Sequence, residues 1–183
     1  KLQQDIESLF FKSGYLKAGE VNPTLTNITF KTNDQVHADQ LTISNDRGVV
    51  DSKLDDVSIK NIYSDEASGN IVVDALQWAD GNITINSRLH PKGKPKKTSL
   101  LVKNVSGKNT QFNFVKEEVA CNAFVTNLQL SSLYKSNSGP VTIKGLSVKG
   151  DQLTFSNTSI RMNSENFSLS DGQQEFKNTH FEK

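Results

Sequence analysis

From Leu25 onward, apolar side chains recur at every second position over most of the chain. Ile28 and Phe30, for example, are separated by one polar residue. A period of two places alternate side chains on opposite faces of an extended strand. The sequence therefore predicts half-buried β-strands, each with one apolar and one polar face.

Clusters of Gly, Asn, Asp and Ser interrupt the alternating runs, and these residues tolerate the backbone of tight turns. The clearest prediction is a hairpin at Asp80-Gly81, between a run that ends at Trp78 and one that begins at Ile83. Connections this short argue against a doubly wound α/β fold. The predicted fold is mainly β, an antiparallel meander that forms a curled sheet, a β-groove or a sandwich. Further turns are expected at Ser68-Gly69-Asn70, Ser106-Gly107-Lys108, Gly150-Asp151 and Asp171-Gly172.

A loose internal repeat recurs along the chain. Two apolar residues are separated by two other residues, and a third apolar residue follows two positions later. It is seen in Leu54-Asp-Asp-Val57-Ser-Ile59 and in Ile143-Lys-Gly-Leu146-Ser-Val148. The copies are irregularly spaced, whereas a solenoid or propeller would show a fixed period. We therefore expect a sheet that grows by hairpins of different length.

The N-terminal segment has a different pattern. Leu2, Ile6, Leu9 and Phe10 follow helical spacing, which predicts one short amphipathic helix. The predicted organisation is this helix and a connector over residues 1–20, followed by a single repetitive β domain over residues 21–183. Because the chain begins without methionine, we expect it to be a section of a longer protein.

Composition fits strands that have a wet face, since only 34% of the residues are apolar. The 21 Lys and Arg residues balance 20 Asp and Glu residues, which gives a net charge of +1. No overall field therefore favours nucleic acid as a partner. No run of about 20 apolar residues is present, so membrane contact is expected only through segments outside this chain.

Candidate catalytic and metal-binding residues are few. The single cysteine, Cys121, lies on the apolar side of an alternating run and is interpreted as a small buried hydrophobe. His37, His90 and His180 have no partner at the spacing of a zinc site. We therefore expect no enzyme activity, no metal and no cofactor. A hydrolase that uses two scattered carboxylates remains an alternative.

One segment concentrates positive charge, with five basic residues and no acidic residue between positions 88 and 97. It is interpreted as a solvated hairpin tip. Alternatively, it contacts anionic lipid head groups, where each cation contributes on the order of 1 kcal/mol. The residues are Arg88, Lys92, Lys94, Lys96 and Lys97.

The strand rhythm resembles that of AsmA-like envelope proteins, which are related to the TamB group of bacteria. The residues that carry the resemblance lie in Leu54-Asp-Asp-Val57-Ser-Ile59-Lys-Asn-Ile62 and in the run from Phe124 to Val148. Members of this family are anchored in the inner membrane and extend a long β-groove into the periplasm. They are implicated in moving phospholipids or in outer-membrane assembly. This chain lacks the membrane helix of the family.

The resemblance implies a groove that shields acyl chains, at about 0.8 kcal/mol per buried methylene. The same side chains could instead close on each other as a dry sandwich core. The residues expected to line the groove are Ile28, Phe30, Leu41, Ile43, Val57, Ile59, Ile71, Val73, Ile83, Ile85, Phe112, Phe114, Val141 and Ile143.

The sequence thus favours a non-enzymatic β module of a bacterial envelope protein, located in the periplasm and anchored to a membrane in its full-length form. Its expected role is to bind or transfer phospholipid or another envelope lipid, or to act as a scaffold in envelope assembly. The alternative is a carbohydrate-binding or adhesin-type β-sandwich or β-helix at the cell surface. In that case the polar rows of Asn, Ser and Thr would make the contacts.

Overall fold

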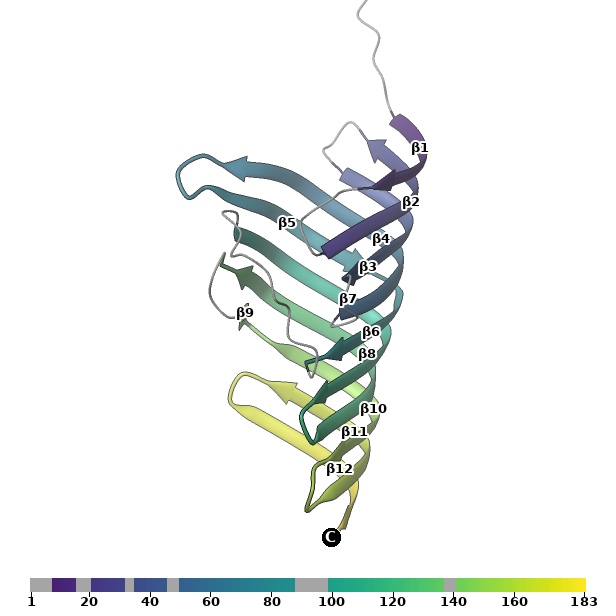
Figure 1. The fold of residues 1–183 in the computed structure, drawn as a ribbon, viewed down its shortest axis with the longest axis vertical. Helices are drawn as coiled ribbons and strands as arrows, with labels where there is room; N and C mark the ends of the chain where they lie inside the picture. The colour runs from purple at the N-terminus through teal and green to yellow at the C-terminus, as the bar shows by residue number, and fades with distance from the viewer. Residues whose placement is uncertain (1–7, 16–20, 32–34, 46–49, 88–98, 137–140) are drawn as a thin grey trace, which may run out of the picture.

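In the computed structural model, the described residues form twelve β-strands of one mixed sheet (Figure 1). The structure describes all residues except 1–7, 16–20, 32–34, 46–49, 88–98 and 137–140. Regular structure in the described residues is entirely β, which confirms the predicted class. The strands are β1 (Ser8–Tyr15), β2 (Val21–Lys31), β3 (Gln35–Asn45), β4 (Val50–Asp65), β5 (Asn70–Trp78), β6 (Asp80–Asn86), β7 (Ser99–Lys116), β8 (Val119–Lys135), β9 (Val141–Lys144), β10 (Ser147–Ser156), β11 (Arg161–Ser170) and β12 (Gln173–Glu182).

Neighbouring strands follow the order β1-β2-β3-β4-β5-β7-β8-β10-β11-β12. In addition, β6 pairs with β4 and β7, and β9 pairs with β8. Every pairing is antiparallel except those of β7 with β5 and β6, which are parallel. The sheet is therefore mixed, and the prediction of a purely antiparallel meander is wrong.

The hairpin predicted at Asp80-Gly81 is wrong. Strands β5 and β6 lie end to end, since both pair with β4 on one side and with β7 on the other. Gly81 makes room for packing, because a Cβ there would lie 2.9 Å from Leu54 Cδ2 and 3.2 Å from Trp78 Nε1. The glycine thus marks a bend in one long strand rather than a reversal of the chain.

The predicted N-terminal helix is not seen, and residues 8–15 form strand β1 instead. This strand pairs antiparallel with β2, where Phe11 lies opposite Ile28. The rings of Phe11 and Phe30 also meet edge to face at 5.6 Å. Because β2 would otherwise present unpaired backbone groups, pairing along this edge overrides the helical spacing of a few apolar residues.

The basic segment connects β6 to β7, and these strands are parallel. A hairpin joins antiparallel strands, whereas a parallel pair needs a crossover of a dozen or more residues. The prediction of a hairpin tip is therefore wrong.

Left-handed residues occur in the middle of every second strand along the path. Asn27 in β2, for example, has φ 51°. Such a residue interrupts the regular pleat, and Asn and Asp accept this conformation more readily than other non-glycine residues. The others are Asp56 and Asn61 in β4, Asn104 and Asn109 in β7, Gln152 in β10 and Asn178 in β12, whereas β1, β3, β5, β6, β8 and β11 have none among their described residues.

These positions explain the loose repeat in the sequence. Leu54 and Val57 lie three positions apart, which strict alternation would place on opposite faces, yet both are buried. The left-handed Asp56 lies between them, so two successive polar residues leave the core and the apolar phase resumes afterwards. The bend thus keeps apolar residues of both strand halves on one face.

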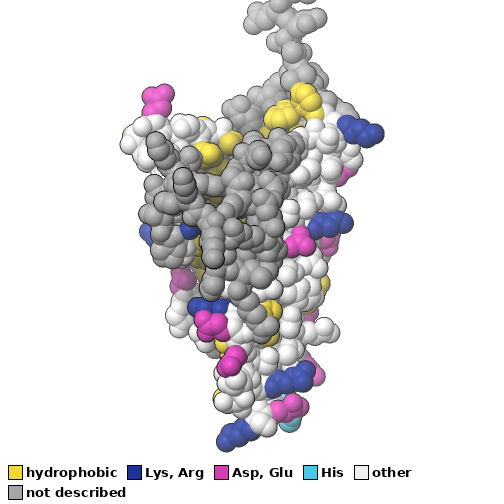
Figure 2. All heavy atoms as spheres, viewed as in Figure 1, with side chains coloured by type: hydrophobic (Ala, Val, Ile, Leu, Met, Phe, Trp, Pro, Cys, Tyr) yellow, Lys and Arg dark blue, Asp and Glu magenta, His cyan; other side chains and the backbone are white. Residues whose placement is uncertain are grey.

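Two clusters of buried apolar side chains share that face. Partly buried Leu128 and Leu146 pack against both clusters and connect them. We call this the core face and the opposite one the polar face. No helix or second sheet among the described residues covers the core face, so its side chains bury one another as the sheet curves (Figure 1). Hydrophobic side chains remain visible beside the grey atoms in Figure 2.

Candidate functional site

The apolar residues predicted to line a groove lie on neighbouring strands, and their burial differs from the centre of the core face to its ends. Ile28, Leu41, Val57 and Ile59 are buried in the first cluster. Ile43, Val73 and Ile83 pack against that cluster, and Phe112 packs against the second. Ile85 and Phe114 are half-buried and lie opposite each other. Phe30, Ile71, Val141 and Ile143 are exposed.

At one end of the core face the apolar rows continue into solvent. Val73 and Val102 are register partners within the packed core, and this row continues to Ile62 on one side and to Leu133 and Ile143 on the other. The next row runs from Ile71 through Leu100 and Lys135 to Val141. We call the exposed apolar members the apolar margin: Ile62, Ile71, Leu100, Val141 and Ile143, which are 38–57% exposed.

Glycines in mid-strand let aromatic side chains lie flat against the core face. A Cβ at Gly107 would lie 2.1 Å from the indole of Trp78, and one at Gly150 would lie 2.7 Å from the ring of Phe167. The Trp78 Nε1 donates to Thr110 Oγ1 at 2.8 Å within the core. Both glycines were expected in turns, and the close approach of an aromatic ring is what the sequence could not show.

On the polar face, Asp74 is the centre of a hydrogen-bonded group that ties β4, β5 and β7 together. Its carboxylate accepts from Asn61 Nδ2 at 3.0 Å and from Lys103 Nζ at 3.0 Å. These two contacts lower the pKa of Asp74, and the contact with Asp74 raises the pKa of Lys103. Because every member has a partner, this group stabilises the sheet and offers no free catalytic acid or base.

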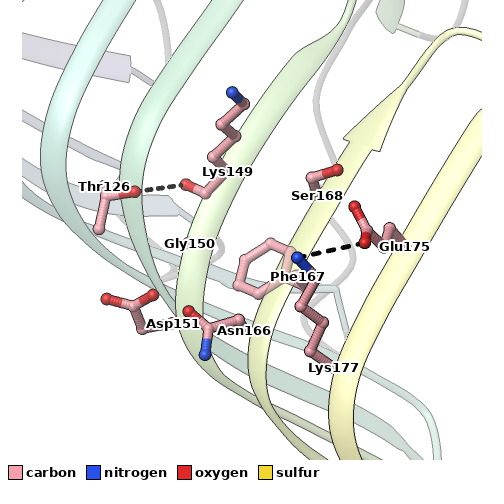
Figure 3. Close-up of a pocket in the computed structure, with 9 residues that line it drawn as sticks. All are labelled: Thr126, Lys149, Gly150, Asp151, Asn166, Phe167, Ser168, Glu175 and Lys177. Atoms are coloured by element: carbon pink, nitrogen blue, oxygen red, sulfur yellow. Dashed lines mark hydrogen bonds and ion pairs between the residues drawn. The ribbon is translucent and has the colours of Figure 1, made fainter.

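Two open depressions lie on the polar face, at the level of the bends. The first has a volume of about 390 Å³ and is formed by side chains of β8, β10, β11 and β12 (Figure 3). The second has a volume of about 360 Å³ and is formed by β4, β5, β7 and β8. Residues of β8 line both, so the depressions adjoin.

The described residues contain no group of three or more side chains that could hold a metal ion. His37 lies 3.8 Å from the carboxylate of Asp56, and His180 lies 3.7 Å from that of Glu182. Both pairs are open to solvent. Burial raises the pKa of the Cys121 thiol, which packs against the second core cluster. In the described part of the chain, no helix has the length and hydrophobicity that crossing a membrane requires.

The predicted head-group residues Arg88, Lys92, Lys94, Lys96 and Lys97 lie outside the described residues.

A scan against known protein families finds no match, and a search of curated proteins finds no similar sequence. The resemblance to AsmA-like proteins therefore stays a prediction that rests on strand rhythm.

Proposed function

We propose that this chain is a non-enzymatic β module of a bacterial envelope protein and that its core face binds the acyl chains of a lipid. The observation that carries the proposal is the apolar margin. Its five side chains continue the rows of the packed core and remain open to solvent. Lys135 lies between Leu100 and Val141 in the second row. A cluster of exposed apolar side chains of this kind marks an interaction site.

The open sheet supports the same proposal. Among the described strands, β1 and β12 end the path and do not pair with each other, so this sheet is open at both edges. Exposed Phe11 lies at one edge, and exposed Phe176 and Phe181 lie at the other. An acyl chain laid along the margin would gain about 0.8 kcal/mol per methylene removed from water. Such binding requires no catalytic group, consistent with a carrier or scaffold role.

The variant Ile143→Asp tests the proposal, because it places a charge in the apolar margin at a side chain that is 49% exposed. We expect phospholipid to co-purify with the wild-type chain in native mass spectrometry. The variant should co-purify with at least about tenfold less phospholipid. An acyl chain bound on the margin would bury the introduced carboxylate without a partner, which is strongly unfavourable.

Ile160→Asp is the matched control. Ile160 is 42% exposed and lies between β10 and β11, away from the margin. This variant should bind lipid as the wild type does. Equal loss in both variants, or a wild-type chain that carries no lipid and takes none up from vesicles, would contradict the proposal.

A further inference from the structure

The two depressions on the polar face adjoin at β8, and together they cross seven neighbouring strands, from β4 to β12; we call this path the trough. Asn127 lines the second depression and is the register partner of Lys149, which lines the first. At a strand spacing of about 4.8 Å, this path is roughly 30 Å long. A long and open path suits an extended polymer better than a compact small molecule, which binds in an enclosed cavity.

Uncharged polar side chains line the second depression in a continuous cross-strand row. Ser58 lies opposite Gln77, Gln77 opposite Ser106, and Ser106 opposite Gln129. Hydroxyl and carboxamide groups both donate and accept hydrogen bonds. The hydroxyl groups of a sugar do the same, so such a row can satisfy them without any charge on the ligand.

Charges in the trough cancel. Three carboxylates and three ammonium groups line it: Asp56, Asp151 and Glu175 with Lys108, Lys149 and Lys177. Lys177 is paired with Glu175 at 3.3 Å (Figure 3). A balanced lining attracts neither an anionic polymer such as nucleic acid nor a polycation.

We propose that the trough binds a linear, neutral polysaccharide that runs across the strands. One pyranose unit is comparable in length to the strand spacing of about 4.8 Å, so each sugar can meet the side chains of one strand. The aromatic residues at the trough, Trp78 and Phe167, have their side chains packed in the core and are only 6% exposed, so binding relies on hydrogen bonds instead of aromatic stacking. The affinity for a single sugar is therefore weak and rises with chain length. This site lies on the face opposite the apolar margin and does not depend on lipid binding.

Affinity electrophoresis through gels that contain a soluble linear β-glucan tests the proposal, with anionic alginate as the comparison polymer. We expect the β-glucan to retard the wild-type chain and alginate to leave its mobility unchanged. The double variant Gln77→Ala/Gln129→Ala should bind the β-glucan about tenfold more weakly, because it removes two side chains that donate and accept hydrogen bonds. Glucan oligomers of increasing length should compete better up to about seven units, the number of strands crossed.

The matched control is Gln111→Ala/Asn122→Ala, which removes two carboxamides from β7 and β8 on the same face. Neither residue lines a depression. This variant should be retarded as the wild type is. Absence of retardation by the β-glucan, stronger retardation by alginate, or equal loss in the two double variants would overturn the proposal. The Gln77→Ala/Gln129→Ala variant should lose affinity for the β-glucan and bind lipid as the wild type does. Failure of one proposal can therefore be distinguished from failure of the other.

Discussion

Single residues with positive φ interrupt the pleat of alternate strands along this sheet. Asn27 Nδ2 donates to Asp39 Oδ2 at 2.6 Å across the neighbouring strand, and Asn178 Nδ2 donates to Glu165 Oε2 at 2.6 Å. Each hydrogen bond joins a left-handed residue to a carboxylate on the adjacent strand. The bend and its brace are therefore built from the same short polar side chain.

Asn109 tests the backbone effect alone, because it is exposed and has φ 41°. Asn109→Val should destabilise the fold by about 1–2 kcal/mol, since a β-branched residue is strained in the left-handed region. Asn109→Gly should be neutral or slightly stabilising, because glycine accepts this conformation freely. Urea denaturation followed by circular dichroism measures both. Equal stability of the two variants would show that the left-handed backbone carries no cost.

The alternation of apolar and polar residues was enough to predict a β fold and the apolar faces of individual strands. Val57, for example, was predicted to be apolar-facing and is fully buried. The sequence shows the two residues between Leu54 and Val57 as part of a repeat. It does not show that a left-handed residue lies behind this spacing. A left-handed residue leaves only a weak trace in sequence, because Asn and Asp are equally common in turns.

Among the elements, the parallel pairing of β7 with β5 and β6 was the least predictable. Sequence patterns report the face of a strand, whereas strand direction depends on distant partners. Glycine was misleading for the same reason, since Gly81, Gly107 and Gly150 serve close packing and not chain reversal. Where glycine did indicate a turn, at Gly69 and Gly172, it has positive φ between antiparallel strands.

Asp74 in β5 links this strand to its parallel neighbour β7. Its carboxylate accepts a hydrogen bond from Lys103 Nζ, and its main-chain oxygen accepts one from Asn104 Nδ2 at 2.9 Å. The pKa of Asp74 is lower in the folded chain than its value of 3.8 in the unfolded chain. The ionised carboxylate therefore stabilises the fold above pH 3.8, and this contribution is lost as the pH falls through the pKa of the folded state. Asp74→Asn should therefore lower Tm most at neutral pH, and its difference from the wild type should shrink below about pH 4. Thermal melts between pH 7 and pH 2.5 measure this, with Asp171→Asn in the β11–β12 turn as control. A difference that stays constant over this range would contradict the assignment.

At the scale of the molecule, the described residues form a single sheet in which contacts between strands run mainly between hydrogen-bonded neighbours. Stability in such an arrangement is close to a sum of local terms and is lowest where a strand has one neighbour. The central strands β4, β5, β7 and β8 carry most of the first core cluster, whereas β12 is almost entirely exposed.

Hydrogen exchange followed by mass spectrometry should reflect this gradient. Peptides from β7 and β8 should exchange most slowly, and protection should fall toward β12, because opening an edge strand breaks one ladder rather than two. Uniform protection across all strands would instead indicate that the sheet unfolds only as one cooperative unit.

The placement of left-handed residues on alternate strands has a consequence for how genes of this kind can lengthen or shorten. A single inserted strand would put two bent strands, or two plain ones, side by side and break the alternation. Duplications and deletions that preserve the fold should therefore comprise an even number of strands, one bent and one plain in each added pair.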